Sequence, residues 1–186
     1  MRTSLLALLV LLAPAALAAP TRVQSTIARA AEAQVGVTLY YDFTYVQLRY
    51  PGGDVPRDRG VCTDVVVRAF RAAGVDLQYE VHRDMTAAFA QYPKAWGLRA
   101  PDPNIDHRRV PNLITFFKRR GKAVRDDDFQ PGDVVAWRLP QGRYHVGVIS
   151  RGVTASGTPL VVHNIGYGAR KEDVLHAFDI IGHYRW

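Results

Sequence analysis

One cysteine and two of the six histidines have sequence surroundings in which they could act together chemically. Cys62 is the only cysteine of the chain and stands in RGVCTDVV, after a turn-forming stretch and at the expected start of a helix. His145 opens HVGVIS and His163 ends PLVVH, and both stretches have the composition of buried strands. A thiol nucleophile needs a lowered pKa, a base within reach and a residue that orients the base. The positive end of a helix favours thiolate, so this order predicts a reactive thiol with a histidine as its base.

Each of these residues also has a purely structural interpretation. A single cysteine excludes an intramolecular disulfide, which leaves an inert buried thiol, an intermolecular bridge or a reactive thiol. A histidine on a buried strand can be a hydrogen-bonded structural residue. Consecutive strands of a meander are usually neighbours, so His145 and His163 can lie side by side, one as the base and the other orienting it. The combined order of one helix-start cysteine and two strand histidines favours the reactive thiol.

Periodicity and turn residues predict the elements that must position these side chains. Apolar residues spaced by three and four predict helices at residues 26–35, 62–73, 82–91 and 113–120. Apolar and β-branched stretches separated by Gly and Pro predict strands at residues 134–139, 144–150, 160–164 and 174–184. Helices followed by an antiparallel meander predict a single α+β domain.

The N-terminus is typical of an exported protein. A short basic start, an apolar run over residues 5–12 and a small-residue site predict a signal peptide over residues 1–18, cut after Ala18 or Ala19. The alternatives are a membrane anchor or a buried helix, but the apolar run is short for a bilayer span of about 20 residues. We therefore expect residues 19–186 to form one catalytic domain, periplasmic or secreted, without stable membrane insertion after signal cleavage.

The charge balance limits the classes of partner. The formal net charge is +7, which in an exported protein favours polyanions such as the cell wall. The arginines are scattered and accompany no nucleic-acid motif, so nucleic acid is not an expected partner. We expect a monomer that needs no cofactor and whose partners are polyanions outside the cytoplasm.

The order of motifs resembles the NlpC/P60 group of papain-like peptidoglycan hydrolases. That group carries a helix-start cysteine in a DCSG-like motif, a PGD(V/L) turn, an HVGIY strand and a next strand that ends in histidine. The counterparts here are GVCTDVV, QPGDVVAW, YHVGVIS and LVVHNIG. The resemblance covers roughly residues 40–168. It implies a papain-like α+β fold, with N-terminal helices packed on an antiparallel sheet.

The chain after the signal peptide is also similar to a narrower group, the secreted bacterial family called domain of unknown function 1287. The stretches that carry this similarity are YPGGDVPRDRGVCTDVVVRAFR, NIDHRRVPNL, PGDVVAW, HVGVIS and HNIGYG. They extend over nearly the full length. This second resemblance implies membership of a family and little chemistry.

The first resemblance implies roles for individual residues. It makes Cys62 the nucleophile, His145 the general base and His163 the residue that orients the base. In the larger group a tyrosine upstream of the cysteine helps to hold the oxyanion or substrate, and the candidates here are Tyr41, Tyr45 and Tyr50. Asp64, in CTD where the group has CSG, and Asn164 are also expected among the substrate-binding residues.

The segment IDHRRVPN forms a second candidate site. Arginine grips carboxylates through two parallel hydrogen bonds, and stem peptides are rich in carboxylates, so substrate binding is predicted for His107, Arg108 and Arg109. The alternative is a solvated turn in which Asp106 pairs with an arginine, and His107 is a minor candidate for the base. For the helix after Cys62 we expect a surface ion pair between Asp64 and Arg68, one turn apart.

Three hypotheses of function follow. The first is an exported thiol hydrolase that cleaves an amide bond of the stem peptides through an acyl-enzyme on Cys62. The second is a zinc amidase in which Cys62, His145 and His163 bind the metal and water is the fourth ligand, although no HExxH or CxxC motif accompanies them. The third is a wall-binding module without turnover, which explains the charge but leaves the order of cysteine and histidines unexplained.

Overall fold

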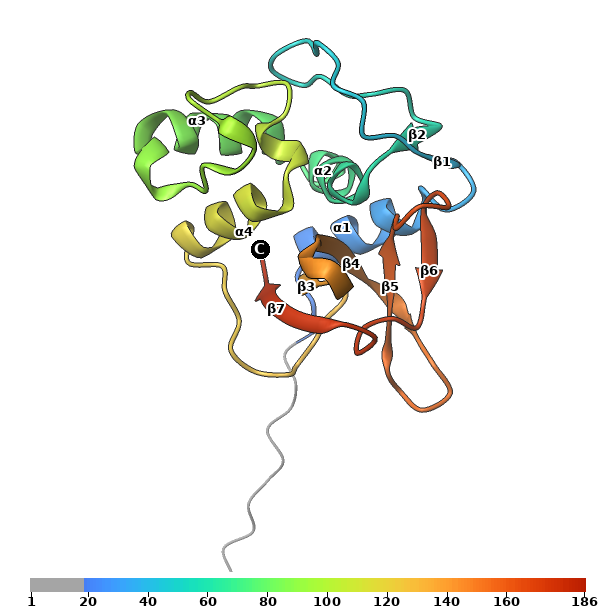
Figure 1. Ribbon diagram of the computed structural model, residues 1–186. Coiled ribbons are helices and arrows are strands. Elements are labelled where there is room, and N and C mark those ends of the chain that lie inside the picture. The colour runs from blue at the N-terminus through green and yellow to red at the C-terminus, as the bar shows by residue number, and fades with distance from the viewer. Residues whose placement is uncertain (1–18) are drawn as a thin grey trace, which may run out of the picture.

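The computed structural model describes residues 19–186 as one layer of helices packed against a curved sheet (Figure 1). The expected signal peptide, residues 1–18, lies outside the described residues. In residues 19–186 no helix has the length and apolar character to cross a bilayer. The elements in chain order are α1 (Arg22–Glu32), β1 (Tyr40–Tyr41), β2 (Arg59–Gly60), α2 (Cys62–Ala72), α3 (Leu77–Ala88), α4 (Val110–Arg119), β3 (Val134–Arg138), β4 (Tyr144–Val153), β5 (Pro159–His163), β6 (Arg170–Glu172) and β7 (Asp179–Tyr184).

The main sheet has five antiparallel strands in the order β6-β5-β4-β3-β7. The expected α+β class is therefore confirmed, and β3, β4 and β5 are neighbours in the sheet, as in the first three strands of the predicted meander. The final strand differs from the prediction, because β7 returns across the sheet and pairs with the free edge of β3. The single strand predicted over residues 174–184 is in fact the short β7, and β6 is an additional strand that lies between the predicted strands.

Both faces of the sheet carry apolar side chains, because successive residues of a strand point to opposite faces. Val134 and Ala136 face the helices and join the main core with residues of α1, α2 and α4. Val135 and Trp137 face the opposite side and pack in a second cluster with Leu175. Helices α1 and α2 pack directly against β4, so the start of α2 and the histidine of β4 belong to adjoining layers.

Helix α2 begins at Cys62, as predicted, whereas three other helices begin earlier than expected. Thr21 caps α1 reciprocally with Gln24, and the Asp76 carboxylate accepts a hydrogen bond at the start of α3. Helix α4 begins at Val110 and has Pro111 in its first turn. Proline is tolerated there because the N–H groups of the first turn have no partner within the helix, so the missing N–H of proline costs no hydrogen bond. Thr21, Asp76 and Pro111 are the residues in the sequence that indicate where these three helices begin.

Candidate active site

The backbone before Cys62 is shaped by one glycine and one carboxylate. Asp64 reaches back and accepts a hydrogen bond from the N–H of Val61 at 2.6 Å, which caps the first turn of α2. Gly60 has a φ of 153°, and a Cβ there would lie 2.8 Å from Oδ2 of Asp64. Glycine at position 60 therefore lets the carboxylate close the cap, and the cap sets the direction in which Cys62 leaves the turn.

The carboxylate of Asp64 is paired with Arg108, which corrects the expected surface pair with Arg68. Nε and Nη2 of Arg108 each lie 3.0 Å from an oxygen of Asp64, and both side chains are almost fully buried. Arg108 also donates to the carbonyl groups of Asp42 and Thr44. A spacing rule within one helix cannot find this pair, because its partner comes from a loop 44 residues away.

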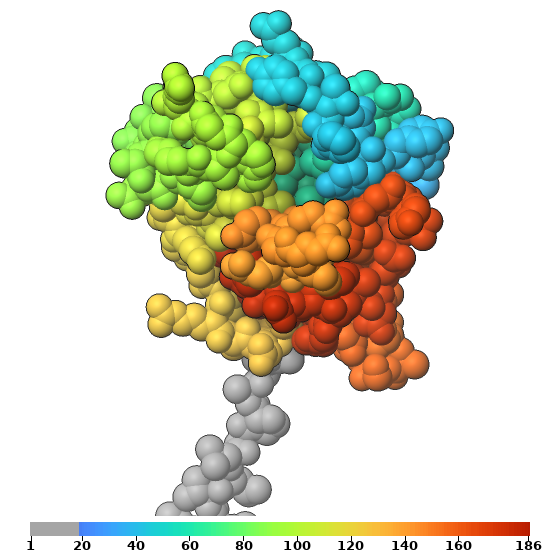
Figure 2. Space-filling view, viewed as in Figure 1, coloured from blue at the N-terminus to red at the C-terminus, as the bar shows by residue number. Residues whose placement is uncertain are grey.

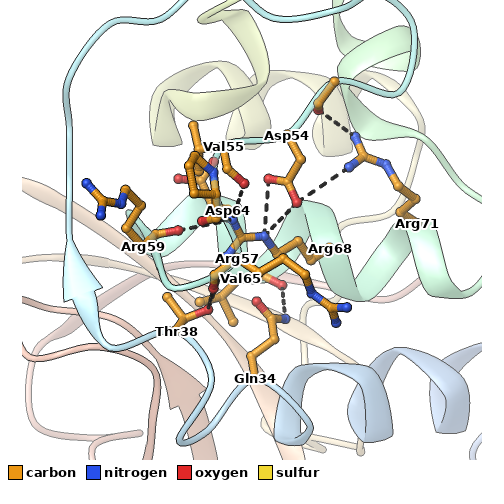
Figure 3. Close-up of polar contacts among 12 residues, drawn as sticks. Gln34, Thr38, Asp54, Val55, Arg57, Arg59, Asp64, Val65, Arg68 and Arg71 are labelled. Atoms are coloured by element: carbon orange, nitrogen blue, oxygen red, sulfur yellow. Dashed lines mark hydrogen bonds and ion pairs between the residues drawn. The ribbon is translucent and has the colours of Figure 1, made fainter.

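Arg68 instead fastens the loop that leads to the cysteine (Figure 3). Its guanidinium donates to both oxygens of Asp54 and to the hydroxyl of Thr38. It also donates to three carbonyl groups of the same loop, those of Val55, Pro56 and Arg59. The loop between residues 54 and 59 is thus held on α2, directly before Gly60.

The thiol of Cys62 is buried, and burial raises its pKa to about 12. A backbone hydrogen bond from Val146 opposes this rise, whereas the negative charge of Asp64 adds to it. The predicted lowering of the thiol pKa by the helix end is therefore wrong, since desolvation of the anion is the larger effect. At rest Cys62 is a neutral thiol held against the backbone of β4.

A protonated thiol predicts a distinctive pH dependence of alkylation. Thiolate is the reactive species, so the rate of modification by iodoacetamide should rise about tenfold per pH unit up to at least about pH 9, without a plateau. The measurement is mass spectrometry of quenched samples between pH 5 and pH 10. The urea-unfolded chain is the control, and its rate should level off near the ordinary thiol pKa of about 8.5. A folded protein whose rate is already constant at pH 6 would contain a preformed thiolate.

The two predicted histidines are in contact, and a carboxylate continues the chain. Nε2 of His145 lies 2.8 Å from Nδ1 of His163, and Nε2 of His163 lies 2.9 Å from Oε2 of Glu172. Burial and the neighbouring His163 lower the pKa of His145 to about 3. Burial also lowers the pKa of His163, although Glu172 acts in the opposite direction. Both imidazoles are therefore neutral at pH 7.

The carboxylate fixes the tautomer of both rings. Glu172 can only accept, so the hydrogen of His163 is on Nε2 and points to Glu172. Nδ1 of His163 is then an acceptor, and His145 must donate to it from Nε2. This leaves Nδ1 of His145 without a hydrogen. The ring is thus in the tautomer that can accept a proton from a donor on its other side.

Cys62 and His145 line two adjoining hollows in the surface. Cys62 lines one of about 430 Å³ and His145 lines one of about 360 Å³, and both are bordered by Tyr41, Arg143 and Tyr144. Figure 2 shows the first as a depression between the blue segment near residue 40, the yellow-green segment near residue 110 and the orange segment near residue 140. Within residues 19–186 the sulfur and the imidazole have no hydrogen bond to each other. Contacts of this kind often tighten only when substrate is bound.

The three candidate tyrosines have different positions. Tyr41 borders both hollows, and burial followed by the proximity of Cys62 raises the pKa of its phenol to about 12, so it remains an O–H donor. Tyr45 is exposed and hydrogen-bonded to Asp102, and Tyr50 stacks with Tyr79. Neither Tyr45 nor Tyr50 lines the hollow with the thiol, so Tyr41 is the tyrosine that the structure brings to the site.

The other predicted binding residues also separate. His107 is buried outside the hollow, and burial lowers its pKa to about 3, so it is not placed to act as the base. Asp106 is buried and hydrogen-bonded to His82 rather than to an arginine, so the alternative of a solvated turn with an Asp106–arginine pair is wrong. Arg108 and Arg109 both line the hollow. Asn164 is fully buried, and its amide donates to the carbonyl of Gly60, which ties the end of β5 to the turn before Cys62.

Glu172 is the functional candidate that the sequence did not yield. It lies on a strand of three residues, and no motif marks it. The available signal was chemical, because a histidine that orients another histidine needs an acceptor on its far side. A carboxylate on a strand following His163 was the residue type to look for.

The geometry of the histidines does not fit the zinc alternative. Ligand nitrogens of a shared metal point to one centre about 2.0–2.1 Å from each, whereas the facing nitrogens of His145 and His163 point at each other. Across residues 19–186, no three His, Cys, Asp or Glu side chains are grouped so that they could hold a metal ion. The arrangement is that of a hydrogen-bonded chain that leads from a carboxylate to a base.

Comparison with known proteins finds a family model, a curated relative and a solved structure that resemble the chain. Residues 28–186 match the family described as "Domain of unknown function (DUF1287)". The chain is similar to "Uncharacterized protein YijF" of Escherichia coli (strain K12), with 57% identity over 164 residues that cover 86% of this chain and 80% of the relative. Among solved structures it is similar to NlpC1 from Trichomonas vaginalis, with 15% identity and a TM-score of 0.49. That match covers 88% of this chain but 44% of the solved chain, so this chain spans less than half of its length.

Proposed function

The chain belongs to the DUF1287 family, and from the chemistry of its site we propose that it is an exported thiol hydrolase that cleaves an amide bond in peptidoglycan stem peptides. One observation carries the proposal, namely the chain Glu172–His163–His145. This chain of hydrogen bonds leaves His145 neutral, with Nδ1 free to accept a proton. The next residue of the same strand, Val146, forms a backbone hydrogen bond with the thiol of Cys62. The motifs shared with NlpC/P60 hydrolases and the positive net charge support the cell wall as the substrate.

The first half of the proposed reaction forms a thioester. The thiol of Cys62 gives its proton to Nδ1 of His145 while the sulfur attacks the carbonyl carbon of the scissile amide. The carbonyl oxygen becomes negative, and the N–H groups at the start of α2 and the hydroxyl of Tyr41 are the donors available to it. The C–N bond then breaks, and the leaving amine takes the proton from His145.

The second half regenerates the enzyme. Water gives a proton to Nδ1 of His145 as its oxygen attacks the thioester carbon, and the C–S bond breaks. The sulfur takes the proton back, and the peptide leaves with a new carboxylate. His163 and Glu172 act as positioning residues throughout, since they hold His145 in the tautomer and orientation that both halves need.

The direct test is digestion of purified peptidoglycan, followed by mass spectrometry of the released muropeptides. The proposal expects pairs of new fragments whose summed mass exceeds that of the parent by one water, and their masses identify the amide that was cut. Binding to peptidoglycan without any product would favour a wall-binding module. Activity lost on addition of a chelator and restored by zinc would favour a metalloamidase.

The role of Glu172 can be tested by Glu172→Gln. An amide can donate to His163, and this would reverse both hydrogen bonds and place the hydrogen of His145 on the wrong nitrogen. Because Glu172 is partly exposed and two residues removed from the sulfur, we expect kcat to fall about 10- to 100-fold with little change in KM. The measurement is the kcat–pH profile on a soluble stem peptide.

The neighbouring Asp173→Asn is the matched control, since it removes a charge from the adjacent position, and it should keep the wild-type kcat. A merely structural role for Glu172 would lower the melting temperature and leave the profile shape unchanged. Equal kcat for Glu172→Gln and the wild type would show that the carboxylate does not set the tautomer.

A further inference from the structure

The hollow at the thiol has aromatic walls and only basic charges. Its rings come from Tyr41, Phe43, Trp96 and Tyr144, and no Asp or Glu is among the described residues that line it. Three arginines line it as well, namely Arg108, Arg109 and Arg143. A ligand that fits this hollow has an apolar body and a negative group.

Trp96 holds an unusual backbone conformation at the rim. Its φ of 61° lies in the left-handed region, which is unfavourable for a residue other than glycine. The side chain is 63% exposed, so burial of the indole does not offset this cost. Instead the ring lies under the guanidinium of Arg109, 4.5 Å from ring centre to Cζ. The strained residue thus serves as a platform that fixes one arginine in the hollow.

The adjacent Arg108 and Arg109 differ in their hydrogen-bonding partners. Arg108 has all its contacts inside the protein, in Asp64 and two carbonyl groups. Arg109 has no ion pair among residues 19–186, and its buried Nη1 has no hydrogen-bond partner there. A buried donor without a partner is unfavourable. Arg109 as a whole is only partly buried and lines the hollow, so the side of its guanidinium that faces the hollow is open to an acceptor from a ligand.

We infer that Arg109, seated on Trp96, binds a free carboxylate of the stem peptide close to the scissile amide, and so selects acidic stem peptides over amidated ones. This inference rests on the proposed function and names the substrate group that the site selects. Arginine suits a planar carboxylate because its fork donates two parallel hydrogen bonds. A carboxamide in the same place would offer one acceptor and a donor that faces a cation.

The test uses two synthetic stem peptides that differ only in a carboxylate or a carboxamide next to the scissile bond. We expect the wild type to prefer the acid by at least about tenfold in kcat/KM, as for a hydrogen bond to a charged group. Arg109→Gln should remove the preference, mainly through KM for the acid peptide. Arg109→Lys should keep part of it, and Trp96→Leu should weaken it while leaving the cation in place.

Arg83→Gln is the matched control, because Arg83 also lies over an exposed ring, that of Tyr79, but outside the hollow. It should keep the wild-type preference. Turnover of both peptides at equal kcat/KM by the wild type would overturn the inference and leave the hydrolase proposal intact. The same holds if Arg109→Gln, shown by its melting curve to be folded, retains the preference.

A binding measurement separates this inference from the proposed chemistry. Isothermal titration of Cys62→Ala protein with each peptide needs no turnover. Tighter binding of the acid peptide, lost in the double variant Cys62→Ala/Arg109→Gln, would support the carboxylate site even if no peptide were ever cleaved. Absence of binding by either peptide, or equal binding of both, would overturn it.

Discussion

Replacement of Cys62 by alanine is expected to lower the rate of muropeptide release by at least about 10⁴-fold, because the acyl-enzyme can no longer form. His145→Ala should have an effect of similar size, since the neutral thiol of Cys62 then has no group to take its proton. The two losses should not add in the double variant, because the residues act as one unit. The measurement is the initial rate on purified peptidoglycan by mass spectrometry.

His176→Ala is the control for histidine removal, since His176 is exposed and lies outside both hollows. It should keep the wild-type rate. Far-ultraviolet circular dichroism and melting curves must show that Cys62→Ala and His145→Ala remain folded. Full activity of folded Cys62→Ala protein would end the thiol hydrolase proposal outright.

Replacement of Arg108 by methionine should destabilise the fold by about 3–5 kcal/mol, because it leaves the Asp64 carboxylate buried without its partner. The change also removes the link from the start of α2 to the loop around residues 42–44. The free energy of unfolding from urea titration measures the effect. The double variant Asp64→Asn/Arg108→Met should recover part of it, since no unpaired charge then remains.

An exposed ion pair provides the comparison. Arg151 forms charge-assisted hydrogen bonds to Glu32 at the surface, and Arg151→Met should cost no more than about 1 kcal/mol. If Arg108→Met were equally mild, the pair of Asp64 and Arg108 would not be what holds the first turn of α2.

The sequence was most informative where local periodicity and local chemistry coincide. The position of Cys62 at the first residue of a helix follows from the residue pattern of one short segment. The positions of the two histidines on neighbouring strands follow from such local patterns as well. The return of β7 to the edge of β3 does not follow from such spacing, because strand order depends on which sheet edge is left uncovered. The partner of Asp64 was inaccessible for the same reason, since it lies in a distant loop.

The charge state of the site could not be predicted from the position of Cys62 in a helix. The helix end favours thiolate by a modest amount, whereas burial against β4 acts more strongly in the opposite direction. The extent of burial depends on how the helix and sheet layers pack. The tautomer of His145 depends likewise on Glu172, a residue that only the folded sheet brings beside His163.

The neutral state of the Cys62 thiol has a consequence for the durability of the protein. Peroxides and disulfides attack thiolates far faster than thiols, and sulfenic acid is the first step towards irreversible oxidation. Because the only cysteine of the chain is buried and protonated, its sulfur is in its least oxidisable form. Under the proposed function, Cys62 would therefore survive in an oxidising compartment without a second cysteine to protect it, and only the proton transfer that begins each turnover would activate it.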